Sequence, residues 1–136
     1  MIKMVETLQH KFLLPSGKGM TVLDVMKFCY SLSETEVLVL IALTGPKTVE
    51  DLEQELKLSK AAVTRSLNKL LELDLVKRTK ETGNRPGRPR YIYLRQNELL
   101  NKIMNDVEIC AKNMVELTKS QLLSGLTGIE TGTALS

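Results

Sequence analysis

The feature that most constrains the fold is a set of closely spaced helix starts in the first half of the chain. Ser33 is followed three residues later by Glu36, and Thr48 by Asp51, which is the spacing of a capping box. Ser59 is a third residue of the N-cap type, placed directly before an amphipathic stretch. Short turn sequences separate these starts. The sequence therefore predicts three helices with tight connections, over 34–43, from 49 onward, and over 60–73.

The segments that flank these helices have other periods. Apolar residues at helical spacing predict a further helix over Thr21–Tyr30. After Asp74 the pattern becomes that of strands, which we expect over Val76–Lys80 and Tyr91–Leu94. The stretch Glu81–Arg90, with two Gly and two Pro, forms the tip of the hairpin between them. Helix, tight turn, helix and hairpin in this order are typical of a winged helix-turn-helix.

The two ends of the chain carry weaker patterns. Val5, Leu8 and Phe12 stand at helical spacing, so a short N-terminal helix or arm is expected before the break at Pro15. Beyond Asn97, apolar residues alternate spacings of three and four, which is a heptad seam; its members are Leu100, Ile103, Val107, Cys110, Met114 and Leu117. We expect this helix to end at Gly125, before a disordered tail.

The expected organisation follows from these segments. It comprises an N-terminal arm and linker (1–19), a winged helix-turn-helix domain (20–96), a C-terminal dimerisation helix (97–124) and a tail (125–136). The fold class is mainly α with a small β-hairpin. Because the chain has no Trp and only 4% aromatic residues, its core must be aliphatic.

Several classes of function are excluded by what the sequence lacks. The longest apolar run, Val37–Leu43, is far shorter than the roughly 18 residues of a membrane span. The two cysteines and the single His10 do not have metal-ligand spacing. Gly17-Lys18 lacks the other residues of a phosphate-binding loop, and no nucleophile stands near a base. We therefore expect no catalytic residues, no metal and no cofactor, in a cytoplasmic protein that is not an enzyme.

Charge is distributed unevenly along the chain. Between Lys57 and Arg95 there are eleven Lys and Arg, including every arginine, against three acids, a net charge of +8. The rest of the chain has eight cations against thirteen acids, a net charge of −5. A strongly basic central segment in an otherwise acidic chain is expected of a protein that binds a polyanion. An ordinary solvated surface is the alternative.

The helix over 60–73 has the residues expected of a DNA-reading element. Val63, Leu67 and Leu70 share one face, so the opposite face carries four other side chains, Ala61, Thr64, Arg65 and Asn68. Arg can pair with guanine and Asn with adenine, while Thr and Ala suit a thymine methyl group. Ser59, Lys60 and Lys69 flank this face, where phosphates would lie. The alternative is that this face is merely solvated.

The hairpin tip is a second candidate DNA contact. Arg85, Arg88 and Arg90 alternate with Gly and Pro, in a pattern similar to the core of an AT-hook. An extended cationic strip fits a narrow minor groove, where the potential is most negative. A basic wing that touches phosphates without selectivity is the alternative.

At this point a resemblance can be stated. Leu32–Leu38, Thr48–Leu52, Leu58–Leu71 and the wing that follows resemble archaeal winged-helix regulators of the TrmB-like, MarR-like and Lrs14-like families. The resemblance covers about residues 20–96, and the C-terminal helix is similar to the dimerisation helix of the Lrs14-like group. It implies a homodimer whose Ser59–Leu73 helix enters the major groove of DNA. The large effector domain of TrmB-type proteins has no counterpart here, so sugar sensing is not expected.

Together these patterns predict a transcription regulator that binds double-stranded DNA as a homodimer. Two alternatives remain at this point, namely an architectural chromatin protein with little sequence specificity, and a winged-helix module that binds protein or RNA. The heptad seam could also fold back on its own domain instead of forming a dimer. The sequence does not identify an operator or a small-molecule effector.

Overall fold

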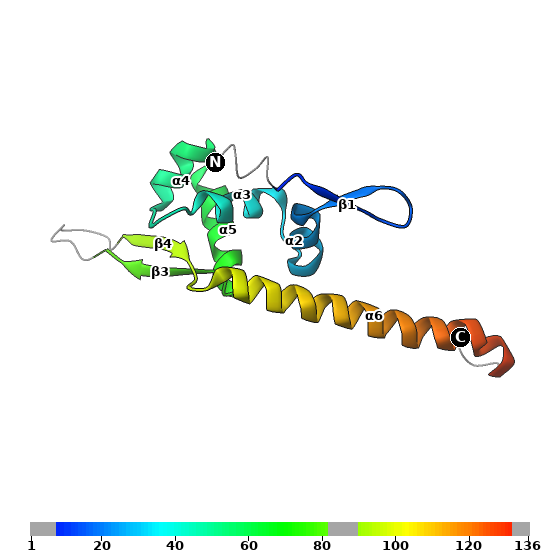
Figure 1. Cartoon of the computed structure of the whole chain (residues 1–136). Coiled ribbons are helices and arrows are strands. Elements are labelled where there is room, and N and C mark those ends of the chain that lie inside the picture. Colours follow the sequence, from blue (N-terminus) through cyan, green and yellow to red (C-terminus); the bar gives the residue numbers. More distant parts are fainter. Residues whose placement is uncertain (1–7, 82–89, 132–136) are drawn as a thin grey trace. The chain divides into compact units, whose positions relative to one another are not determined.

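The computed structural model describes residues 8–81 and 90–131. The chain divides into two compact units, residues 1–99 and residues 100–136, and each is described by itself. The second unit is the long helix α6 (Leu99–Thr131). The described elements of the first unit, all but β2 labelled in Figure 1, are β1 (Lys11–Leu13), β2 (Gly19–Thr21), α2 (Val22–Tyr30), α3 (Glu34–Ala42), α4 (Val49–Leu56), α5 (Lys60–Glu72), β3 (Val76–Lys80) and β4 (Tyr91–Arg95).

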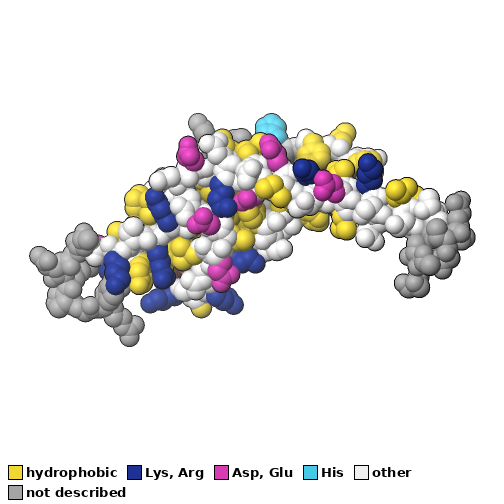
Figure 2. All heavy atoms as spheres, turned by 90° about the horizontal axis from the view of Figure 1, so that it is seen from below, with side chains coloured by type: hydrophobic (Ala, Val, Ile, Leu, Met, Phe, Trp, Pro, Cys, Tyr) yellow, Lys and Arg dark blue, Asp and Glu magenta, His cyan; other side chains and the backbone are white. Residues whose placement is uncertain are grey.

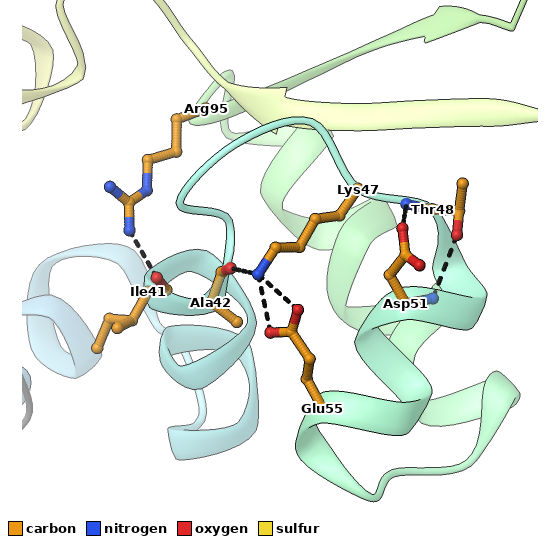
Figure 3. Close-up of polar contacts among 7 residues, drawn as sticks. All are labelled: Ile41, Ala42, Lys47, Thr48, Asp51, Glu55 and Arg95. Atoms are coloured by element: carbon orange, nitrogen blue, oxygen red, sulfur yellow. Dashed lines mark hydrogen bonds and ion pairs between the residues drawn. The ribbon is translucent and has the colours of Figure 1, made fainter. Parts of the chain in front are cut away.

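The helix starts lie where the capping patterns predicted them. The Ser33 hydroxyl accepts a hydrogen bond from the Glu36 N–H at 3.3 Å, and the Glu36 carboxylate accepts one from the Ser33 N–H at 2.9 Å. Thr48 and Asp51 form the same reciprocal pair at 3.2 and 2.9 Å (Figure 3). These bonds lower the pKa of Asp51. Because that pKa lies below its unfolded value, Asp51 stabilises the fold at neutral pH, and the contribution is lost as the pH falls through the acidic range.

The core of the first unit lies among α3, α4, α5 and the hairpin β3–β4. α3 is buried along most of its length, as its continuous apolar sequence predicted, and no aromatic ring is among the largest fully buried side chains. Those side chains are Val39, Leu43, Leu52, Val63, Leu67, Leu70, Leu75 and Val76. The core is mainly aliphatic, as predicted, although Tyr30 and Tyr93 are also buried in it.

The wing is an antiparallel hairpin in which Val76 pairs with Arg95 and Lys80 with Tyr91. The two predicted strands are confirmed, and β4 runs one residue further than expected, to Arg95. Lys47 forms an isolated antiparallel β-bridge with Tyr93 of β4, in which the N–H and C=O of the two residues exchange hydrogen bonds at 2.9 and 2.8 Å. This bridge fixes the wing to the segment that leads into α4.

Two cations from distant parts of the sequence close the C-terminal end of α3 (Figure 3). Arg95 donates from Nε to the Leu40 carbonyl at 3.1 Å and from Nη2 to the Ile41 carbonyl at 2.6 Å. Lys47 donates from Nζ to the Ala42 carbonyl at 2.7 Å and also pairs with Glu55. The last carbonyls of a helix carry partial negative charge, so cations stabilise them. Burial lowers the pKa of Arg95 from its ordinary value.

We expect Arg95→Ala to lower the free energy of unfolding by about 2 kcal/mol, because hydrogen bonds from a charged group are lost and two carbonyls at a buried helix end lose their partners. Urea unfolding at a fixed protein concentration measures this. Arg65→Ala is the matched control, since Arg65 is exposed on α5 and its removal should change stability by less than about 0.5 kcal/mol. Equal unfolding midpoints for both variants would contradict a stabilising role for Arg95.

The described part of the expected N-terminal helix or arm, from residue 8 onward, is not helical. Leu8 and Phe12 stand at helical spacing, but Lys11–Leu13 is a strand that pairs with Gly19–Thr21 in a second antiparallel hairpin. The turn between the strands is closed by two backbone hydrogen bonds of 2.8 Å each, from the Leu14 N–H to the Lys18 carbonyl and from the Gly17 N–H to the Leu14 carbonyl. Gly17 has φ of 87°, a conformation that glycine adopts without strain. Val5 lies outside the described residues.

The C-terminal helix also differs in its end point. α6 continues through Gly125 to Thr131, whereas the sequence predicted an end at Gly125. An interior glycine costs a helix only about 1 kcal/mol relative to alanine, so it does not by itself end one. Residues 125–131 of the expected disordered tail are therefore helical, and residues 132–136 lie outside the described residues. Within the described part of the chain, no helix, α6 included, is long and apolar enough to cross a membrane.

Candidate nucleic-acid interface

The position of α5 is set by a three-residue connection to α4. Lys57 ends α4 in the left-handed conformation, with φ of 54°, and thereby turns the chain sharply. Ser59 then begins α5, and its hydroxyl accepts a hydrogen bond from the Ala62 N–H at 3.1 Å. The predicted helix-turn-helix is thus formed by α4, this turn and α5.

α5 has one buried face and one accessible face. Val63, Ser66, Leu67 and Leu70 are buried. The four predicted base-reading residues lie on the accessible side, where Ala61, Arg65 and Asn68 are exposed and Thr64 is half-buried. Within the described residues, neither the Arg65 nor the Asn68 side chain has a hydrogen-bond or ion-pair partner. The structure thus brings together four side chains that the sequence predicted to share a face.

The predicted phosphate-contacting residues lie at both ends of this face. Lys60 is exposed in the first turn of α5, and Lys69 is half-buried near its last turn. The first turn of α5 contains no acid. The Ser59 hydroxyl is exposed, and although its oxygen caps the helix, its own proton remains available to an acceptor. The N-terminal end of α5 is therefore electropositive, through both the cation and the helix dipole.

The arginines of the wing have three different environments. Arg85 and Arg88 lie outside the described residues. Arg90, at the base of the wing, is near two carboxylates, with Nη2 at 3.6 Å from Glu50 and Nε at 3.8 Å from Glu81. Arg78 lies over the Tyr91 ring, 4.3 Å from its centroid. Arg95 points to the end of α3, as described above.

Counting charges along the sequence therefore overstates the cations that are available to a ligand. Arg95 is a structural residue, and Arg90 has acidic neighbours of its own. The sequence did not predict that Glu50 lies near Arg90, because Glu50 is outside the basic segment and far from Arg90 along the chain. In Figure 2, Lys and Arg side chains nevertheless gather on the part of the first unit that lies towards the wing.

α6, taken by itself, exposes many large apolar side chains for a helix in water. Of the predicted seam, Leu100, Met114 and Leu117 are exposed, and Ile103, Val107 and Cys110 are half-buried. An open hollow of about 490 Å³ lies beside this seam and shares Met114 with it. It is lined by Ala111, Met114, Val115, Thr118 and Lys119, of which the first four are spaced at i, i+3, i+4 and i+7. Four residues in this arrangement form the hole that receives a side chain in a coiled coil.

Comparisons with known proteins agree with this architecture. A model of the MarR family matches residues 30–85, which include α3, α4, α5 and β3. The structure is similar to that of a protein from the thermoacidophilic archaeon Sulfolobus tokodaii, with 38% sequence identity and a TM-score of 0.63, over 71% of this chain and 93% of the other. A possible transcriptional regulator from Methanosarcina mazei Go1 shares the fold, with 22% identity and a TM-score of 0.72, over 85% of this chain and 96% of that one. No curated protein sequence matches.

The helix-turn-helix, the wing and the long final helix define the class of the molecule as a winged-helix protein. The chain belongs to the MarR-like family of winged-helix transcription regulators. It is accordingly a regulator and not an enzyme.

Proposed function

We propose that this protein is a sequence-preferring regulator that binds double-stranded DNA as a homodimer. α5 enters the major groove, and the wing over 81–90 lies in or near the minor groove. The observation that carries the proposal is the accessible face of α5, where a guanidinium, an amide, a hydroxyl and a methyl group stand together. We assign DNA binding to residues 20–96 and dimerisation to the helix that follows.

The chemistry of that face favours reading of bases over simple attraction to phosphate. Arg65 can donate two hydrogen bonds to guanine, and Asn68 can pair with adenine in the same manner. Thr64 and Ala61 present methyl groups that suit thymine. Ser59, Lys60 and Lys69 border this face and are suited to contact the phosphates on either side, which would fix the helix in the groove.

The wing supplies the second contact. Its cations Arg85, Arg88 and Arg90 follow one another at short spacing with proline between them. Such a strip complements the strong negative potential of a narrow, A·T-rich minor groove. We propose that Arg88, at the centre of the strip, is inserted, and that its neighbours contact the backbone.

Dimerisation is supported by the pattern of side-chain sizes along α6. One stripe alternates large and small residues, with Val115 and Leu122 interspersed among Ala111, Thr118 and Gly125. In an antiparallel pair that crosses between Val115 and Thr118, each large residue of one helix lies opposite a small residue of the other, so the hollow at Ala111–Thr118 receives a large side chain. We propose this antiparallel pairing, with the predicted seam residues Leu100, Ile103, Val107, Cys110, Met114 and Leu117 along or beside the contact.

The archaeal sources of both similar structures support an archaeal origin and action in the cytoplasm, where the DNA lies.

An architectural protein that coats DNA would share the basic surface but would not need the base-reading face. Selection of bound sequences from a random duplex library separates the two, because a recovered motif supports the regulator and an unenriched pool supports the architectural protein.

We expect the binding of duplex DNA to weaken steeply with salt. Each phosphate neutralised contributes a slope of about −0.9 in a plot of log affinity against log salt concentration. Lys60, Lys69 and the wing give several contacts per protomer, so a slope steeper than about −4 is expected for the dimer. Gel shifts at several salt concentrations measure the slope, with single-stranded DNA and duplex RNA as competitors. A slope near zero, or preference for a competitor, would contradict DNA recognition.

A further inference from the structure

The base of the wing contains a carboxylate that does not belong to the wing. Glu50 is in the first turn of α4, two residues after Thr48, which caps that helix. Its Oε2 lies 3.6 Å from Nη2 of Arg90, on the strand side of the hairpin tip. Glu81 is at the opposite end of the tip. Its Oε2 lies 3.8 Å from Nε of Arg90. Its backbone N–H donates a hydrogen bond to the Arg90 carbonyl at 2.8 Å. One guanidinium therefore faces two carboxylates.

These contacts offset the charge of Arg90 but do not supply its guanidinium with short hydrogen bonds. Both distances exceed the 2.7–2.9 Å that is usual for a charge-assisted hydrogen bond, so the guanidinium is attracted to the carboxylates but is not held by short bonds. The side chains remain accessible, with 38% of Arg90 and 55% of Glu50 exposed. An accessible ion pair of this kind is weak and is readily exchanged for another anion.

Glu50 also lies within the field of the other basic element. Its pKa is lowered by its own backbone N–H at the helix start and by the nearby charges of Arg90 and Lys60, so the carboxylate is fully ionised at neutral pH. Lys60 is the first residue of α5. Glu50 therefore interacts electrostatically both with the first residue of α5 and with the base of the wing, two elements that must both approach the same DNA backbone.

We propose that Glu50 is a resident counter-ion of the wing, which neutralises Arg90 in the free protein and must yield it to a DNA phosphate on binding. The inference rests on the proposed function. Glu50 lowers the affinity for all DNA sequences alike, because the exchange occurs at the backbone and not at a base edge. It is a positioning residue, since it holds Arg90 at the foot of the hairpin until DNA replaces it.

The test compares Glu50→Gln with Glu53→Gln on duplex DNA. Both remove one negative charge from α4, but only Glu50 contacts Arg90. We expect Glu50→Gln to tighten binding roughly two- to fivefold per protomer, as for release of an exposed ion pair. The salt slope should steepen by up to about 0.9 per protomer, because the Glu50 carboxylate left unpaired in the unaltered complex takes up a cation and so offsets one of those released from the DNA. Glu53→Gln should give a smaller gain and an unchanged slope.

A second pair of variants tests whether the effect passes through Arg90. In an Arg90→Gln background, Glu50→Gln should lose most of its advantage and leave the slope unchanged. Thermal unfolding of each variant shows that the fold persists. Equal effects of Glu50→Gln and Glu53→Gln, or an undiminished effect in the Arg90→Gln background, overturn this inference alone. Failure of the unaltered protein to bind duplex DNA overturns the proposed function and this inference with it.

Discussion

Val115→Glu combined with Leu122→Glu is expected to give a folded monomer that binds duplex DNA at least about a hundredfold more weakly than the unaltered protein. Both substitutions place charge on the apolar stripe of α6, where two copies would otherwise exclude water. Two winged units held about 34 Å apart read successive major grooves, and linking two binding modules raises affinity by about 10²- to 10⁴-fold. Light scattering gives the mass, and a gel shift gives the affinity.

α6 itself offers a matched control. Ile109 and Leu123 are also apolar and exposed, but they lie on a different face of the same helix. Ile109→Glu with Leu123→Glu adds the same charge to the same element and should leave both mass and affinity unchanged. A dimer of unaltered mass after the Val115 and Leu122 substitutions would place the contact elsewhere.

One further variant separates the two stripes considered for the interface. Leu117 belongs only to the seam predicted from the sequence, whereas Val115 belongs only to the stripe that lines the hollow, and both are similarly exposed, at 62% and 66%. Leu117→Glu should therefore disturb the dimer less than Val115→Glu. The reverse order would favour the sequence-predicted seam.

The second large effect concerns α5. Arg65→Ala and Asn68→Ala should each weaken binding to a selected site by about 1–3 kcal/mol relative to random DNA, because each removes a pairing with one base edge. The measurement is the ratio of affinities for the selected and the random duplex. Lys60→Ala is the control, since it should weaken both duplexes by the same factor and leave the ratio intact. Equal losses on both duplexes for Arg65→Ala would exclude base reading.

The parts of the fold that depend on local chemistry were predictable. Two helix starts are formed by hydrogen bonds that span only three residues, Ser33 with Glu36 and Thr48 with Asp51. Both partners of each bond are therefore visible in a short stretch of sequence. The accessible face of α5 was predictable for the same reason, because the spacing of Val63, Leu67 and Leu70 determines which side is buried.

The parts that depend on distant partners were not predictable. Phe12 fits helical spacing, yet pairing with Met20 across the turn makes it part of a strand. Arg95 and Arg65 are the same residue type in the same basic segment, but Arg95 finds carbonyls 54 and 55 residues away. Arg90 likewise meets Glu50 from another helix. Counting charges along a sequence cannot distinguish an arginine that faces a ligand from one that supports the fold.

The closure of α3 by Lys47, five residues beyond Ala42, and by the distant Arg95 determines the smallest fragment that can keep this fold. α3 has no basic residue in its own last turn, so its end is completed only when Lys47 and Arg95 are both present. Gln96 extends this requirement by one residue, since its N–H bonds to the Leu75 carbonyl and its side chain bonds to Asp74 at 2.7 Å. An excised winged domain must therefore extend through residue 96, because a chain cut after β3 would leave the central helix open at one end.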